Sequence, residues 1–148
     1  WALIDMARSQ KVTAVGGATA IVVGLVAITP AAGHVSPLSA LALGGIAAIP
    51  SYFALLYRAQ SKLDDSLDVV AAHGVGGTVG ALLTGVFSQK AWSGIADGAL
   101  FGNPYQVVIQ AISIGAVIAY GAVATFVLPD ERRCAVAARA PPRLSAST

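Results

Sequence analysis

The chain has few charged residues and a single cysteine. Only 11% of its 148 residues are charged, whereas soluble domains carry roughly 25%. Because Cys134 is its only cysteine, the chain can form neither an internal disulfide nor a thiolate metal cluster. Its two histidines have no carboxylate or thiolate partners at the spacing of a metal site. We therefore expect no metal and no other cofactor.

The chain also lacks the short motifs that mark ATP hydrolysis and nucleophilic catalysis. It contains no glycine-rich loop ending in Gly-Lys-Ser or Gly-Lys-Thr, and no Gly-x-Ser-x-Gly sequence. The net charge of +2 is small, and the basic residues form no stripe with interleaved aromatic side chains. These absences argue against an enzyme, against transport driven directly by ATP, and against a nucleic-acid partner.

The chain contains four long apolar runs. A helix needs about 20 mostly apolar residues to cross a bilayer. The runs cover residues 12–29, 38–57, 69–87 and 106–128, and the formal charges lie in clusters between them. Four such runs leave too little polar surface to cover a soluble globule. The sequence predicts an all-α integral membrane protein, with a transmembrane domain over 1–128 and a disordered, low-complexity tail over 129–148.

The basic residues predict the orientation of these spans. Since successive spans alternate in direction, the segments 5–11, 58–68 and 129–148 share one side of the membrane. Eight of the nine basic residues lie there, and Lys90 alone lies in the loops of the other side. Positive charge favours the cytoplasmic side. We expect a multi-pass protein of the plasma membrane with a cytoplasmic C-terminus.

His73 is the one histidine within the four runs, which contain no aspartate, glutamate, lysine or arginine. An ionisable group at membrane depth is costly, which makes it a candidate functional residue by default. A neutral imidazole has one donor and one acceptor nitrogen. His73 therefore fits either a structural hydrogen bond between helices or a position in a pore or proton relay, and the residues alone leave both interpretations open.

Small and acidic residues surround His73 in the sequence. The glycines of this run predict a helix that packs closely on several sides, as small residues do in lipid: Gly74, Gly76, Gly77 and Gly80. Asp64, Asp65 and Asp68 precede the run, and acidic side chains there are typical of helix capping. Pairing with Arg58 or Lys62 is the alternative. Capping would fix the start of the helix and thus the depth of His73.

Thr29 ends the first run and Pro30 follows it, as expected of a helix terminator. The Thr29 hydroxyl fits two roles, a hydrogen bond to a backbone carbonyl or a place at the mouth of a pore. The sequence does not separate them.

The segment from Asp64 to Gly80 resembles the tenth helix of Amt-type ammonium transporters. The resemblance rests on Asp-Asp-x-x-Asp-Val-x-x-x-His-Gly-Val-x-Gly-x-Val-Gly, followed by Thr-Gly-Val-Phe at 84–87. Residues 24–33 resemble the end of the eighth helix of that family, and residues 1–11 the close of the seventh. The resemblance runs from Trp1 to about Val127. It implies the C-terminal portion, about helices 8–11, of an eleven-helix fold, and hence a piece of a longer protein.

The resemblance also implies a function. Members of the family assemble as homotrimers with one pore per subunit, in which ammonium loses a proton and passes as ammonia along two hydrogen-bonded histidines. His73 matches the second histidine, Val69 an apolar pore-lining position, and Thr29 a hydroxyl-bearing position near the upper pore. Asp65 and Asp68 match acidic residues at the inner end of the tenth helix.

Two departures from the family limit what the resemblance implies. The partner histidine belongs to the fifth helix, which this chain does not contain. The tail from Asp130 differs from the acidic, glycine-containing segment that meets a trimeric nitrogen-sensing regulator in the family, so that interaction is not carried over. A non-conducting remnant or an assembly partner in the membrane is the alternative function.

Overall fold

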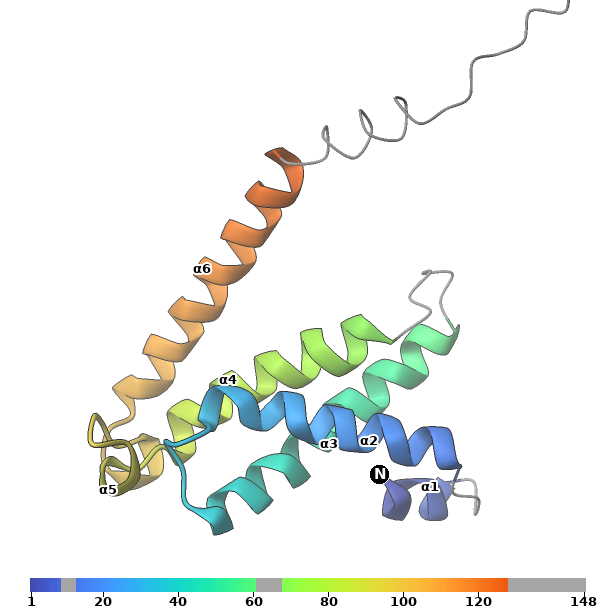
Figure 1. Ribbon diagram of the computed structural model, residues 1–148, viewed down its shortest axis with the longest axis horizontal. Coiled ribbons are helices and arrows are strands. Elements are labelled where there is room, and N and C mark those ends of the chain that lie inside the picture. Colours follow the sequence, from blue (N-terminus) through green and yellow to red (C-terminus); the bar gives the residue numbers. More distant parts are fainter. Residues whose placement is uncertain (9–12, 61–67, 128–148) are drawn as a thin grey trace, which may run out of the picture. The chain divides into compact units, whose positions relative to one another are not determined.

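The computed structural model describes residues 1–8, 13–60 and 68–127, and the regular structure in these ranges is entirely helical (Figure 1). In chain order the elements are α1 (Ala2–Arg8), α2 (Ala14–Ile28), the 3-10 turn η1 (Thr29–Ala31), α3 (Pro37–Gln60), the π-helical turn η2 (Val70–Val75), α4 (Gly76–Phe87), α5 (Lys90–Ser93), the 3-10 turn η3 (Ala99–Phe101) and α6 (Tyr105–Val127). The chain divides into two compact units, Trp1–Ile114 and Gly115–Thr148. The first unit contains every described candidate residue.

The prediction of four membrane spans is confirmed. Four helical segments are long and apolar enough to cross a bilayer: Ala14–Ala31, Pro37–Gln60, Val70–Phe87 and Tyr105–Val127. Their bounds differ from the predicted ones by only a few residues. The predicted tail, together with Asp64 and Asp65, lies outside the described residues.

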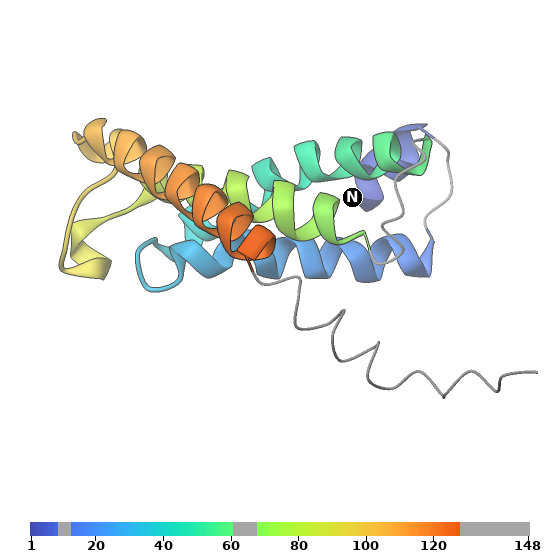
Figure 2. The same cartoon turned by 90° about the horizontal axis from the view of Figure 1, so that it is seen from above.

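Helices α2, α3 and α4 pack against one another at the centre of the first unit. In Figure 2, α4 runs along the line between α2 and α3. Most of the buried side chains between them are small, and the main cluster consists of Ala27, Ala31, Val35, Leu43 and Ala47. Small side chains favour association in lipid because they let helix backbones approach closely. The centre of this unit is therefore held by close packing.

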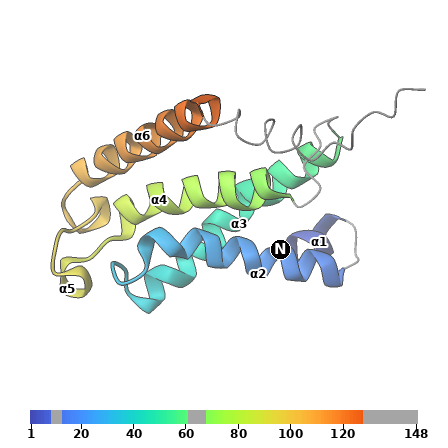
Figure 3. The same cartoon turned by 45° about the horizontal axis from the view of Figure 1, so that its top comes forward.

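The connection after α4 is tied back to its surroundings by hydrogen bonds. The Gly98 amide donates to the Ser88 carbonyl at 2.7 Å, and the Ser88 hydroxyl donates to the Ala96 carbonyl at 3.0 Å. The Gln89 backbone amide donates to the His34 backbone carbonyl at 2.8 Å. This last bond joins the connection to the turn between α2 and α3, beside which it lies in Figure 3. The end of α4 is thus fixed to its neighbours.

At the other end of the unit, α1 is attached to α3. The Trp1 indole donates to the Ala48 carbonyl at 3.0 Å, and the Tyr52 hydroxyl donates to the Asp5 carboxylate at 2.8 Å. The rings of Trp1 and Tyr52 meet edge to face, with centroids 5.2 Å apart. These contacts hold the short α1 helix against the side of α3.

Candidate functional site

His73 lies in the π-helical turn at the start of the third span. The turn covers Val70–Val75 and continues directly into α4. The His73 side chain is exposed, whereas Ala71 and Ala72 immediately before it are only 2% and 4% exposed. Val69, one turn earlier, is also exposed, at 47%. His73 and Val69 therefore lie on a surface that the first unit leaves uncovered.

The part of the span after His73 packs more closely. A Cβ atom added at Gly80 would overlap the Ala27 carbonyl of α2, and it would lie 2.8 Å from the Ala27 Cα. A Cβ atom at Gly76 would lie 3.3 Å from the Ser51 hydroxyl of α3. At Gly80 there is room only for glycine unless α2 moves, whereas at Gly76 the Ser51 hydroxyl would have to give by a few tenths of an ångström. Gly80 and Gly76 are therefore points of close approach of α4 to α2 and to α3.

The other two candidate glycines have more room. A Cβ atom at Gly77 would meet a Val26 methyl group at 3.6 Å, which is ordinary van der Waals contact. At Gly74 it would meet, among the described residues, only Val70 of the same turn, at 3.9 Å. The four glycines thus differ in role, and Gly74 lies on the open side of the span, beside His73.

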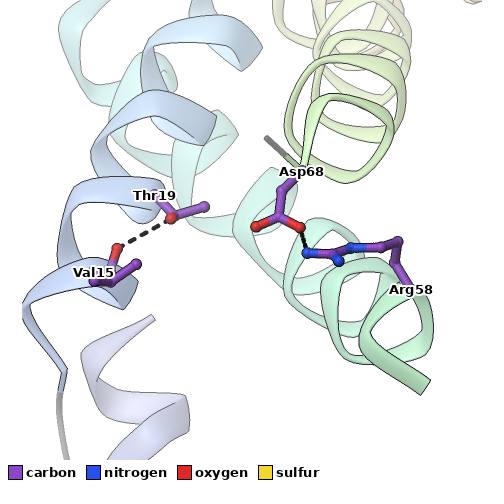
Figure 4. Close-up of polar contacts among 4 residues, drawn as sticks. All are labelled: Val15, Thr19, Arg58 and Asp68. Atoms are coloured by element: carbon purple, nitrogen blue, oxygen red, sulfur yellow. Dashed lines mark hydrogen bonds and ion pairs between the residues drawn. The ribbon is translucent and has the colours of Figure 1, made fainter. Parts of the chain in front are cut away.

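Asp68 stands immediately before the span and forms an ion pair with Arg58 near the end of α3 (Figure 4). Its carbonyl accepts a hydrogen bond from the Ala72 amide at 2.8 Å, so Asp68 begins the helical hydrogen-bond ladder. Its φ angle is +54°, a left-handed conformation that aspartate tolerates better than most residues. The pairing that the sequence left open as the alternative to capping is thus present between Arg58 and Asp68.

Thr29 lies at the opposite end of its own span. Its side chain is exposed, and its hydroxyl donates to the Val26 carbonyl at 2.7 Å. Thr19 donates to the Val15 carbonyl in the same manner, as Figure 4 shows. Hydroxyls on membrane helices commonly bond the carbonyl one turn earlier. The first of the two roles considered for Thr29 is therefore seen, while its exposure leaves the second available.

The candidate residues occupy two levels of the bundle. Gly80 contacts Ala27, which is close to Thr29 in the sequence. His73 lies about 10 Å before Gly80 along the helix axis. We name the level of His73 and Val69 the inner level and that of Thr29 the outer level, after the orientation that the sequence predicts. Asp65 lies outside the described residues.

Sequence reasoning missed two features of this site. The π-helical turn has no counterpart in the prediction, because Val-Val-Ala-Ala-His-Gly is equally compatible with an ordinary α-helix. The Ser51 hydroxyl is fully buried opposite Gly76. Ser51 follows a proline within an apolar run, and this position gave no indication of which side it would face.

Four apolar spans with a histidine exposed near one end of the third define a multi-span membrane protein. The profile described as the Ammonium Transporter Family matches residues 1–130, and the chain belongs to this family. It is 44% identical over 129 residues to an ammonium transporter of Aquifex aeolicus, covering 86% of this chain and 30% of that protein. It is 37% identical over 139 residues to the ammonium transporter Amt1 of Archaeoglobus fulgidus, covering 94% and 35%.

Two solved structures are similar to this fold. The crystal structure of Mep2 from Saccharomyces cerevisiae matches with a TM-score of 0.79 at 35% identity, covering 86% of this chain and 30% of that one. Mep2 from Candida albicans matches with a TM-score of 0.79 at 34% identity, covering 90% and 31%. The chain therefore spans about a third of the length of the relatives that it matches.

Proposed function

We propose that this chain forms part of a pathway that conducts ammonium, as ammonia, across the plasma membrane, and that His73 faces that pathway. The observation that carries the proposal is the exposure of His73 in a span whose later turns are closely packed. A bundle that buries glycine and alanine yet leaves an imidazole and Val69 uncovered presents a surface that other helices can complete. Membership of the Ammonium Transporter Family supports the substrate.

The chemistry of the uncovered surface suits ammonia. Moving an ion into an apolar environment is very costly, whereas a neutral molecule that keeps a hydrogen bond moves at far lower cost. A neutral imidazole accepts a hydrogen bond at one nitrogen and donates one at the other. His73 would bond ammonia and a second histidine, which would come from helices outside this chain. Val69 would keep the path apolar and unfavourable for potassium.

Thr29 would line the outer part of the same path. Its exposed hydroxyl already donates to the Val26 carbonyl, so its oxygen remains able to accept a hydrogen bond from a passing molecule. The chain would lie in the plasma membrane with its C-terminus in the cytoplasm, because eight of its nine basic residues fall on that side. Assembly as a homotrimer belongs to the proposal, whereas binding of a nitrogen-sensing regulator does not.

A complementation experiment tests the proposal. The chain would be expressed alone, and separately joined to the seven preceding helices of the family fold, in cells that lack ammonium transporters and are starved of nitrogen. We expect growth only with the joined protein, and loss of that growth in its His73→Ala variant at unchanged membrane abundance. Uptake by His73→Ala that still excludes potassium would refute the pore assignment.

The same experiment decides the alternative of a non-conducting assembly partner. The absence of a second histidine in the four spans favours this alternative for the chain by itself. If the joined protein reaches the membrane and supports no growth, the chain is such a partner or a remnant.

A further inference from the structure

Three of the four buried positions of α4 follow a regular helical spacing. Gly76, Gly80 and Thr84 recur every four residues, and Gly76 and Gly80 face α3 and α2, whereas the fourth, Gly85, faces the start of α6. In an α-helix successive residues are rotated by about 100°, so these three positions span a sector of about 80°. A residue three before Gly76 would fall within the sector, at about 60°. Continued backward as an α-helix, the span would direct His73 onto the buried face.

The structure buries other residues of this turn. Ala71 and Ala72 are buried, and His73 is exposed. The intervening turn, Val70–Val75, is π-helical, which places one more residue in the turn than an α-helix has. The residue that falls within the buried sector therefore moves back by one, from position 73 to position 72.

We propose that the π-helical turn is the device that directs His73 outward, onto the surface proposed to face the ammonia path. The inference rests on the proposed function for the importance of that direction. The part of the buried face nearest His73 is narrow: a carbon added at Gly80 would overlap the Ala27 backbone, and one added at Gly76 would lie 3.3 Å from the Ser51 hydroxyl. An imidazole directed there would force the helices apart.

Both ends of the turn are fixed, so the extra residue has to stay within it. Asp68 holds the inner end through its ion pair with Arg58 on α3. Gly76 and Gly80 hold the outer end against α2 and α3. Arg58 and Asp68 are therefore positioning residues, because they act on His73 through the backbone between the two attachments.

Two single-residue deletions in the joined protein test this inference. Each shortens the segment between Asp68 and Gly76 by one residue and removes the need for a π turn. After deletion of Val70, His73 remains three residues before Gly76 and turns onto the buried face. After deletion of Gly74, Ala72 takes that place and His73 stays exposed, so this variant is the matched control.

The readout is thiol labelling at position 73, in His73→Cys variants that also carry Cys134→Ser. We expect a small methanethiosulfonate reagent to label position 73 in the joined protein without a deletion. Labelling should be retained after deletion of Gly74 and lost after deletion of Val70. Equal labelling of the two deletion variants would overturn the inference, and so would absence of labelling in the full-length protein.

Membrane abundance supplies a second readout if the deletion of Val70 prevents folding with histidine present. In that case the same deletion combined with His73→Ala should restore abundance, because alanine fits where imidazole does not. Failure of this rescue while the deletion of Gly74 accumulates would contradict the inference. The proposed function is tested separately, by ammonium uptake of full-length His73→Ala, so the two can fail independently.

Discussion

The two halves of the third span differ in how tightly they are held. In the outer half, Gly76–Phe87, glycines bring the backbone close to α2 and α3, and a single carbon added at Gly80 would overlap the Ala27 backbone. In the inner half, Val70–Val75, the turn is π-helical and its histidine is exposed. The comparison shows how one helix separates two tasks. Close packing fixes the helix, and the less constrained turn presents the polar group.

The difference has a cause in the side chains. The outer half can approach its neighbours because glycine has no side chain to separate the backbones. The inner half carries Val70 and His73 and follows directly on Val69, and these three side chains, which cannot all enter so narrow a contact, are exposed. The attachment at its inner end is electrostatic, between Asp68 and Arg58. Substitutions in the two halves should therefore fail in different ways.

His73→Ala should have the largest effect on function and little effect on stability. The exposed imidazole contributes little to packing within this unit, so the joined protein should reach the membrane at normal abundance. Selective ammonium uptake should disappear, because the alanine offers no hydrogen bond to ammonia. Uptake of labelled methylammonium, measured beside membrane abundance, checks both parts. A fall in abundance that matched the fall in uptake would remove the contrast between the halves.

Gly80→Ala should have the largest effect on stability. The new methyl group would meet the Ala27 backbone, which cannot move without shifting α2. Overpacking of this kind costs about 1–3 kcal/mol. Gly74→Ala is the matched control, since its methyl group would meet only Val70 at 3.9 Å among the described residues. Thermal unfolding in detergent should show a lower midpoint for Gly80→Ala, and a midpoint for Gly74→Ala equal to or above that of the parent.

The outer half was the more predictable of the two from sequence. Apolar length alone gave the four spans, because a bilayer sets the number of residues needed to cross it. A Gly-x-x-x-Gly pair gave the expectation of close packing, although not that Gly76 and Gly80 face α2 and α3 while Gly74 faces away. The π turn could not be predicted, since its extra residue reflects the fixed distance between two tertiary attachments. The pairing of Asp68 with Arg58 depends in the same way on how α3 ends.

Substitutions at Asp68 should have intermediate effects, mainly on abundance. Asp68→Ala removes the carboxylate that faces Arg58 and places alanine at a φ of +54°. The left-handed conformation costs a non-glycine residue roughly 1–2 kcal/mol, and a partly exposed ion pair contributes about 0–1 kcal/mol. Asp68→Asn keeps the tolerance for this conformation and loses only the charge. Membrane abundance should therefore fall in the order parent, Asp68→Asn, Asp68→Ala.

The uptake per folded molecule distinguishes support from direct participation by Asp68. If abundance holds in Asp68→Ala while uptake disappears, the carboxylate acts on the substrate, and its role as an anchor of the inner half is wrong. If uptake per molecule falls in Asp68→Asn as well, and position 73 loses thiol labelling, the anchor controls the direction of His73.

Thr29→Val should have the smallest effect, and it extends the comparison to the neighbouring span. Valine keeps the shape of threonine but loses the hydrogen bond to the Val26 carbonyl, which contributes about 0.5–1.5 kcal/mol. Since the side chain is exposed and no buried partner loses its bond, we expect little change in the unfolding midpoint and a few-fold loss of uptake. Thr29→Ser, which keeps the hydroxyl, should transport as the parent does. Equal uptake by the valine and serine variants would restrict the polar part of the path to His73, and the outer level would then contribute packing alone.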